Sequence, residues 1–131
     1  MAKSAAEALD GVCSDHCTFN AKQKALGQDD FRLIPAGVNG AEERMSVVWE
    51  RCGGAGDPAR FVALTSANAA KIFNMYPRKG RIEVGAEADV VVWNPNAAKK
   101  ITKDEHQSKV DFNVFEGKTV HGAAEHVICQ G

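Results

Sequence analysis

The sequence lacks several features that would place it in a membrane or on a nucleic acid. It has no run of 18 or more apolar residues, which excludes a helical membrane span. Its 17 Asp and Glu residues nearly balance 16 Lys and Arg residues, so no basic field exists to hold phosphates. The first residues show no secretory signal pattern. These absences argue against membrane and nucleic-acid partners and favour a cytoplasmic protein.

Cysteine is also scarce, with four residues and no spacing typical of a secreted disulfide framework. We therefore expect reduced thiols. The 131 residues, 44% of them hydrophobic and 25% charged, suffice for one domain with a modest core. Residues 2–9 resemble the tail of a helix, and residues 127–131 stop directly after a strand-like run. Both ends look interrupted, so we expect a fragment of a longer protein.

Helical periodicity dominates the first 80 residues. Residues 20–40 are rich in turn-forming residues and predict a long loop. A helix is expected over 41–52, where Met45, Val48, Trp49 and Cys52 share one face, and Gly53-Gly54 should end it. A second helix is expected over 59–75, with Pro77 ending it. Its apolar positions are Phe61, Leu64, Ile72, Phe73 and Tyr76.

After Gly80 the pattern changes to strand character. Residues 81–84 alternate polar and apolar, and residues 88–93 form a β-branched run typical of a strand buried on both faces. A turn at Asn94-Pro95-Asn96 should follow. Three further short strands are predicted, at 110–115, 119–121 and 125–129. We therefore expect a mixed α/β protein whose helical part gives way to an all-β part near residue 80.

The stretch VCSDHCTF, residues 12–19, places two thiols, an imidazole and a carboxylate after a short predicted strand at Val12-Cys13. A closed structural zinc site needs four ligands, usually in two closely spaced pairs. Cys13 and Cys17 supply one pair, and the sequence contains no second pair. Such a site is therefore disfavoured, and Cys13 is expected to be a small buried side chain.

Asp15 is a candidate catalytic group in this stretch. A carboxylate at a strand end, beside His16, suits a metal ligand that also acts as general base on a bound water. Local spacing alone favours the alternative, an aspartate that forms a turn or caps the next segment. Two other features allow two interpretations each. The loop PAGVNG offers backbone groups to a small ligand or is a plain glycine turn, and Arg78-Lys79 binds an anion or is a solvated pair.

Four strings run through the chain in order: GVCSDHCTFNAKQKALGQDDF, LIPAGVNGAEERMSVVWE, FVALTSANAAKIFNMYPRKGRIEVGAEADVVVWNP and FNVFEGKTVHG. At matching spacing they resemble the C-terminal portion of the dihydropyrimidinase and hydantoinase family of cyclic amidohydrolases. The resemblance covers nearly the whole chain. The dihydropyrimidinase-related (collapsin response mediator) proteins share most of these strings and are the nearest alternative.

The resemblance implies an α/β fold, namely the C-terminal fragment of a metal-dependent amidohydrolase (β/α)8 barrel followed by strands of its β-sandwich domain. Residues 1–80 would hold the last barrel strand (about 8–17), the active-site loop and the helices that close the barrel. Residues 81–131 would form part of the β-sandwich. The change of pattern near residue 80 agrees with this division.

The resemblance also implies a binuclear zinc centre. In such enzymes two Zn²⁺ ions are held by a His-x-His pair, a carboxylated lysine, two further histidines and one aspartate, which matches Asp15 by motif. Asp15 is therefore expected to be a metal ligand and the catalytic proton shuttle. The other ligands would lie upstream, and neither His16 nor Cys17 is expected to bind metal. Main-chain groups of Ala36 and Gly37 are expected to contact the substrate.

Two positions bear on whether the parent is an enzyme or a scaffold. The related non-enzymatic proteins commonly carry alanine in place of Asp15, reading SAHC rather than SDHC, so Asp15 favours an enzyme. The enzymes usually read IPNG, whereas this chain has Ala36 in place of that asparagine, which weakens the assignment. Asn39 is shared by both groups and does not discriminate.

The sequence thus predicts a piece of a hydrolase that opens the ring amide of 5,6-dihydropyrimidines or hydantoins to N-carbamoyl amino acids in pyrimidine degradation. The parent is expected to be a cytoplasmic homotetramer that acts on a small cyclic amide. The piece alone should be inactive, because one aspartate cannot hold a binuclear site. The alternative is a non-enzymatic dihydropyrimidinase-related scaffold. An independent binding module fits poorly, because half a sandwich leaves strand edges open.

Overall fold

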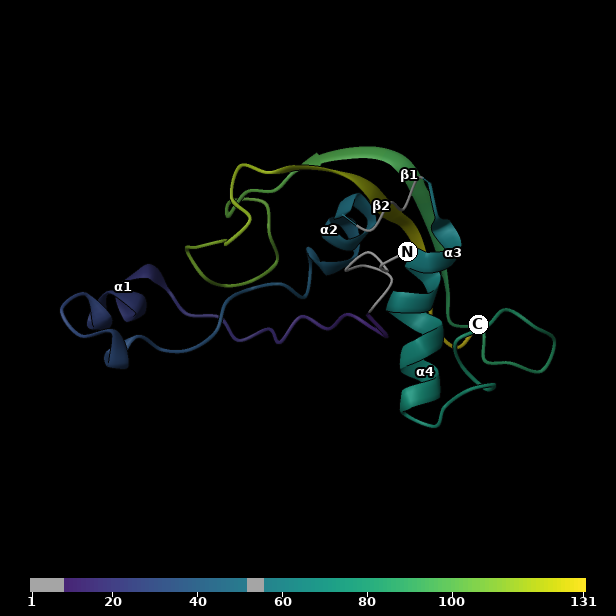
Figure 1. Ribbon diagram of the computed structural model, residues 1–131. Coiled ribbons are helices and arrows are strands. Elements are labelled where there is room, and N and C mark those ends of the chain that lie inside the picture. The colour runs from purple at the N-terminus through teal and green to yellow at the C-terminus, as the bar shows by residue number, and fades with distance from the viewer. Residues whose placement is uncertain (1–8, 52–55) are drawn as a thin grey trace, which may run out of the picture.

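The computed structural model describes residues 9–51 and 56–131 (Figure 1). Helical segments come first and strands follow, in the order that the sequence predicts, but the strands are two long ones rather than several short ones. The segments are α1 (Ala21–Lys24), 3-10 turns at Ala25–Gly27 and Phe31–Leu33, α2 (Arg44–Arg51), α3 (Pro58–Val62), a π turn at Ala63–Ala67, α4 (Asn68–Ile72), β1 (Val90–Lys100) and β2 (Thr119–Ile128). No helix in the described ranges is long and apolar enough to cross a membrane.

The sheet is one antiparallel pair, with Val90 opposite Ile128 and Lys100 opposite Thr119. β2 joins the two short strands that were predicted separately. The turn predicted at Asn94-Pro95-Asn96 is wrong, because these residues lie inside β1, where the register shifts between Asn94 and Ala98. Such a bulge leaves ladder positions unpaired, and proline is tolerated there because it has no N–H to donate.

Two predicted strands are absent from the described residues. Residues 81–84 and 110–115 form bends and turns, and Ile82 and Val84 are almost fully exposed. Alternation alone does not make a strand, because the ladder needs a partner with free N–H and C=O groups. The expectation that residues 88–93 are buried on both faces is also wrong, because the two-stranded sheet leaves Val91 and Val92 exposed.

The core lies where α2 and α3 meet the sheet. Val48 and Trp49 on α2 are buried, as their helical spacing predicts, and Met45 packs against them. Phe61 meets Trp49 edge-on, with ring centroids 4.9 Å apart, and Trp93 of β1 lies 5.6 Å from Trp49. Gly122 of β2, at φ 82°, passes so close to both tryptophans that an added Cβ would lie under 3 Å from their rings. The predictions for Cys52 and Gly53-Gly54 lie outside the described residues.

The second predicted helix runs continuously from Pro58 to Ile72 through the π turn. Asp57 caps it by accepting the Arg60 backbone N–H at 2.9 Å, and Pro58 occupies the first turn. Leu64 is fully buried as predicted, but Ile72, Phe73 and Tyr76 are exposed. These three lie at or beyond the end of α4, which points away from the sheet (Figure 1). The helix ends before the left-handed Asn74 rather than at Pro77.

The strand expected over residues 8–17 is also not formed in its described part. Residues 9–19 are irregular and form one parallel β-bridge, between His16 and Val38, while the Val12 N–H donates to the Leu64 carbonyl at 3.2 Å. A barrel strand needs a neighbour on each side, and no described segment provides the second one. The segment before α1 and the segment after it run beside each other, and α1 lies apart from the sheet (Figure 1).

Candidate functional site

Asp15 lies in the irregular segment before α1 and is exposed to solvent. Its backbone is left-handed, with φ 46°, a conformation that aspartate tolerates better than most residues. Within the described part of the chain no hydrogen bond or ion pair reaches its carboxylate. The side chain is therefore free to meet a metal ion, a substrate or a proton from outside this segment.

His16 fixes the segment next to Asp15. Its Nδ1 accepts hydrogen bonds from the backbone N–H groups of Gly40 and Ala41, at 3.2 and 3.1 Å. Because Nδ1 acts as an acceptor, the proton of the neutral ring is on Nε2. The Cys17 N–H donates to the Val38 carbonyl at 3.0 Å. These bonds hold residues 38–41 against residues 16 and 17.

Ala36 and Gly37 lie beside this contact, as the predicted substrate loop. Gly37 has φ 125°, and an added Cβ would lie 2.4 Å from the Cys17 carbonyl oxygen, so only glycine fits. The Lys24 ammonium donates to the Pro35 carbonyl and, at 2.6 Å, to the Gly37 carbonyl. No hydrogen bond to the Ala36 peptide group occurs among the described residues. Its exposed N–H and C=O remain available to a ligand.

The described residues do not assemble a zinc centre. Across residues 9–51 and 56–131, no three His, Cys, Asp or Glu side chains are grouped to hold a metal ion. Cys13 and Cys17 are exposed; the expectation that Cys13 is buried is wrong, because no sheet covers this segment. Asp15 offers one carboxylate, whereas zinc sites use three or four protein ligands. The residues present therefore do not fit two zinc ions by themselves.

Sequence reasoning missed a buried polar cluster that holds the other side of residues 38–41. Its members are the buried Asn39, Glu43 and Asn113 and the half-buried His106. The Asn39 amide donates to Asn113 Oδ1 at 2.8 Å and accepts the Val114 N–H at 2.8 Å. Asn113 and Val114 lie 74 and 75 positions after Asn39 in the sequence, so no local pattern indicates the contact.

Arg78 and Lys79, a possible anion site by sequence, are instead paired within the chain. Arg78 Nη1 lies 2.6 Å from Glu87 Oε1, and the Lys79 ammonium contacts the carboxylates of both Glu87 and Asp89. The hydrogen bond to Asp89 raises the pKa of Lys79, and the hydrogen bond from Lys79 lowers the pKa of Asp89. With their charges compensated, the two cations form part of a surface ion cluster.

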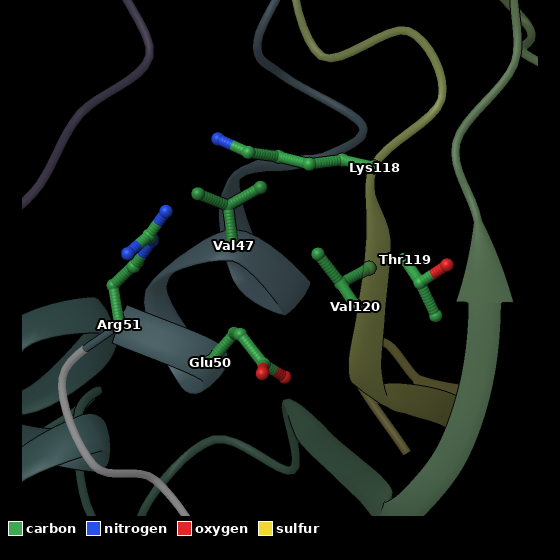
Figure 2. Close-up of a pocket in the computed structure, with 6 residues that line it drawn as sticks. All are labelled: Val47, Glu50, Arg51, Lys118, Thr119 and Val120. Atoms are coloured by element: carbon green, nitrogen blue, oxygen red, sulfur yellow. The ribbon is translucent and has the colours of Figure 1, made fainter.

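A groove of about 260 Å³ lies between α2 and the start of β2. Figure 2 shows Val47, Glu50 and Arg51 on the helix and Lys118, Thr119 and Val120 at the neighbouring strand, with Val120 on the side of the helix and Thr119 on the far side. Its lining includes charges of both signs and none of the residues that the sequence singles out as a site. The groove is therefore separate from Asp15 and its loop.

Comparison with known proteins finds relatives that match nearly the whole chain. The sequence profile of the amidohydrolase family matches residues 1–120. "Dihydropyrimidinase 2" of Caenorhabditis briggsae is 59% identical over 129 residues, covering 97% of this chain and 25% of that protein. "Dihydropyrimidinase-related protein 5" of Mus musculus is 53% identical over 133 aligned positions, covering 100% of this chain and 24% of that protein.

Solved structures agree with the sequence relatives. A D-hydantoinase (dihydropyrimidinase) from Thermus sp. superposes with a TM-score of 0.87 at 37% identity, over 93% of this chain and 27% of that one. The chain thus spans about a quarter of the length of the relatives it matches.

Proposed function

Because this chain belongs to the amidohydrolase family, we propose that it forms the C-terminal part of a dihydropyrimidinase-type hydrolase. The intact protein would open the ring amide of 5,6-dihydropyrimidines or hydantoins and yield N-carbamoyl amino acids, a step of pyrimidine degradation. Relatives named dihydropyrimidinase and D-hydantoinase support this proposal. Residues 1–80 would complete a barrel and residues 81–131 would contribute to a β-sandwich.

The observation that carries the proposal is the exposed Asp15 carboxylate, which lies one residue before the bridge to Val38 and has no partner in the described chain. Asp15 would supply one ligand to two zinc ions whose other ligands come from outside this chain. When bound, such metals supply an activated water and polarise a carbonyl. Asp15 itself can accept and return a proton. The unpaired N–H and C=O of Ala36 can orient a ring amide, whereas the Gly37 carbonyl is bonded to Lys24.

The large surface of the chain supports its place in a bigger assembly. Its accessible area is 9109 Å² for 14.0 kDa, against roughly 6,700 Å² for a compact monomer of this mass by the usual scaling. Exposed apolar side chains include Val91, Val92 and Val127. We propose that the rest of a cytoplasmic parent protein, acting as a homotetramer, covers these faces.

A non-enzymatic scaffold of the dihydropyrimidinase-related class is the second candidate. The 53% identity to dihydropyrimidinase-related protein 5 over the whole chain favours it. Ala36, in place of the asparagine expected of the enzymes, points the same way. The retained Asp15 carboxylate favours the hydrolase, because a scaffold needs no ligand for metal at this position.

A chimera tests the proposal. This chain replaces the matching quarter of the Caenorhabditis briggsae relative, and ring opening of 5,6-dihydrouracil and of hydantoin is measured by loss of ultraviolet absorbance. We expect turnover by the chimera. Asp15→Asn should lower kcat at least about 100-fold and reduce bound zinc, since even partners of metal ligands contribute 10 to 100-fold. Asp29→Asn, an exposed carboxylate in the nearby loop, is the matched control.

The outcomes separate the two candidates. An inactive chimera beside an active unmodified relative would reject the hydrolase and favour the scaffold. Full activity of the Asp15→Asn chimera would reject the role of Asp15. The isolated 131-residue chain should show no turnover and no stoichiometric zinc by elemental analysis; two tightly bound zinc ions would contradict the view that one aspartate is its whole contribution.

A further inference from the structure

Asn113 makes four side-chain hydrogen bonds, the full capacity of an amide. Its Nδ2 donates to Glu43 Oε1 at 2.5 Å and to His106 Nδ1 at 3.2 Å. Its Oδ1 accepts from Asn39 Nδ2 at 2.8 Å and from the Phe115 N–H at 2.9 Å. Asn113 is 2% exposed, and its bonds to Asn39 and Glu43 are shielded from water.

The partners of Asn113 fix which way its amide faces. His106 Nε2 lies 2.9 Å from the Val110 carbonyl, which can only accept, so Nε2 carries the proton and Nδ1 is an acceptor. Glu43 also presents an acceptor. Both therefore require the NH₂ side of the Asn113 amide, and its oxygen must face Asn39. The orientation of this buried amide is thus set by chemistry on both sides.

Asn39 transmits this orientation to the candidate site. It is 3% exposed and bonds to Asn113 and to the Val114 N–H. Its neighbours on either side are the residues that hold the Asp15 segment: Val38 accepts the Cys17 N–H, and Gly40 and Ala41 donate to His16. Residues 38–41 are therefore fixed from two sides, by residues 16 and 17 and by the loop of residues 102–118.

We propose that Asn113 and Asn39 are positioning residues for Asp15: through residues 38–41 and His16 they hold the segment that carries the Asp15 carboxylate. This inference rests on the proposed function of Asp15. Neither side-chain amide touches Asp15. Both act through the backbone N–H groups of Gly40 and Ala41, which donate to His16. A site built on irregular segments needs such support, because it has no sheet ladder to fix it.

The first test measures the geometry of the 131-residue chain without metal or substrate. Asn39→Asp keeps the acceptor for Val114 and replaces only the donor to Asn113. We expect the ¹⁵N–¹⁵N couplings across the hydrogen bonds from Gly40 and Ala41 to His16 Nδ1 to disappear, while the signals of the Trp49 and Trp93 indoles stay in place. Asn39→Ala repeats the test without a buried charge. Asn96→Asp makes the same chemical change at an exposed amide and should preserve the couplings.

Two results would overturn the proposal. Retained couplings in both Asn39 variants would show that the amide pair does not hold the His16 contact. Simultaneous loss of the indole signals would show that the pair supports the whole fold rather than the site.

The second test uses the chimera described above. Asn39→Ala and Asn113→Ala should lower kcat by about tenfold or more with KM changed less than about twofold, because a misplaced catalytic group slows chemistry more than binding. The Asn96→Asp chimera should match the unaltered one. If the unaltered chimera is active and both alanine variants have normal kcat, the positioning role is rejected and the proposed function stands. An inactive unaltered chimera would reject the proposed function, whereas the coupling measurement still decides the geometry.

Discussion

Gly37 shows how closely two segments approach at the candidate site. An added Cβ would lie 2.4 Å from the Cys17 oxygen and 2.6 Å from its Cβ. We predict that Gly37→Ala lowers the free energy of unfolding by about 1–3 kcal/mol more than Gly85→Ala does, because overpacking adds to backbone strain. Urea unfolding followed by circular dichroism measures both variants.

Gly85 is the matched control for this change. It also has a positive φ, 93°, but an added Cβ would meet nothing within 4 Å. The two variants therefore share the strain of a left-handed backbone and differ in the contact with Cys17. Equal losses of stability would mean that residues 16 and 17 move aside freely, and that this contact does not fix the loop.

At the residue scale the sequence was informative where a side chain acts locally. The segment around Asp15 and the glycine at position 37 are recognisable because the motif and the turn chemistry are contained in a few neighbouring residues. Whether Asp15 binds metal stays a prediction. Asn113 could not be found this way. Its role depends on hydrogen bonds to Asn39, Glu43 and His106, and a local sequence pattern does not reveal these contacts.

Among the elements, the continuous helix over residues 58–72 depends on its first turn. We predict that Asp57→Ala costs about 1 kcal/mol of stability, because the cap for the Arg60 N–H is lost. Asp57→Ser should retain most of it, since a serine oxygen caps equally well. Thermal unfolding followed by helical circular dichroism is the measurement.

Asp29→Ala provides the control, because Asp29 is exposed and caps none of the described helices. If it destabilised the chain as much as Asp57→Ala, the effect would be one of charge rather than of capping.

Helices were predicted better than strands for a physical reason. The spacing of Met45, Val48 and Trp49 predicts a helix from neighbouring residues alone, because helix bonds join residues four apart. Strand bonds join distant segments, so residues 81–84 and 110–115 alternate correctly and still form no ladder. The bulge around Pro95 likewise depends on where β2 lies.

Across the whole molecule, the ion cluster of Arg78, Lys79, Glu87 and Asp89 predicts a pH dependence of stability. Hydrogen bonding to Lys79 lowers the pKa of Glu87 and of Asp89 from their ordinary 4.5 and 3.8, and hydrogen bonding to Asp89 raises the pKa of Lys79 from 10.5. The carboxylates therefore stabilise the fold fully above their ordinary values and lose this effect as pH falls through the lowered ones. Lys79 stabilises fully below 10.5 and loses the effect as pH rises through its raised pKa.

We predict that the urea midpoint of the unaltered chain exceeds that of Lys79→Met between about pH 5 and pH 10, and that the two converge outside this range. Arg78 and Asp89 are exposed and Lys79 and Glu87 are half-buried, so solvent ions reach the cluster and added salt should narrow the difference in urea midpoint. Lys22→Met removes an exposed lysine with no ion pair in the described chain and should leave the pH profile unchanged. If the urea midpoints of the unaltered chain and of Lys79→Met differed by the same amount at every pH, the stabilisation by Lys79 would not be ionic.

The packing of Trp49 and Trp93 around Gly122 has an optical consequence. These are the two tryptophans of the chain, and both lie in one cluster at the junction of α2 with the sheet. Tryptophan fluorescence therefore reports on that junction, which Val12 also contacts, and gives no direct signal from residues 14–17. A chain could keep its native emission spectrum while residues 14–17 have separated from residues 37–41, so an unchanged spectrum is no evidence that the candidate site is intact.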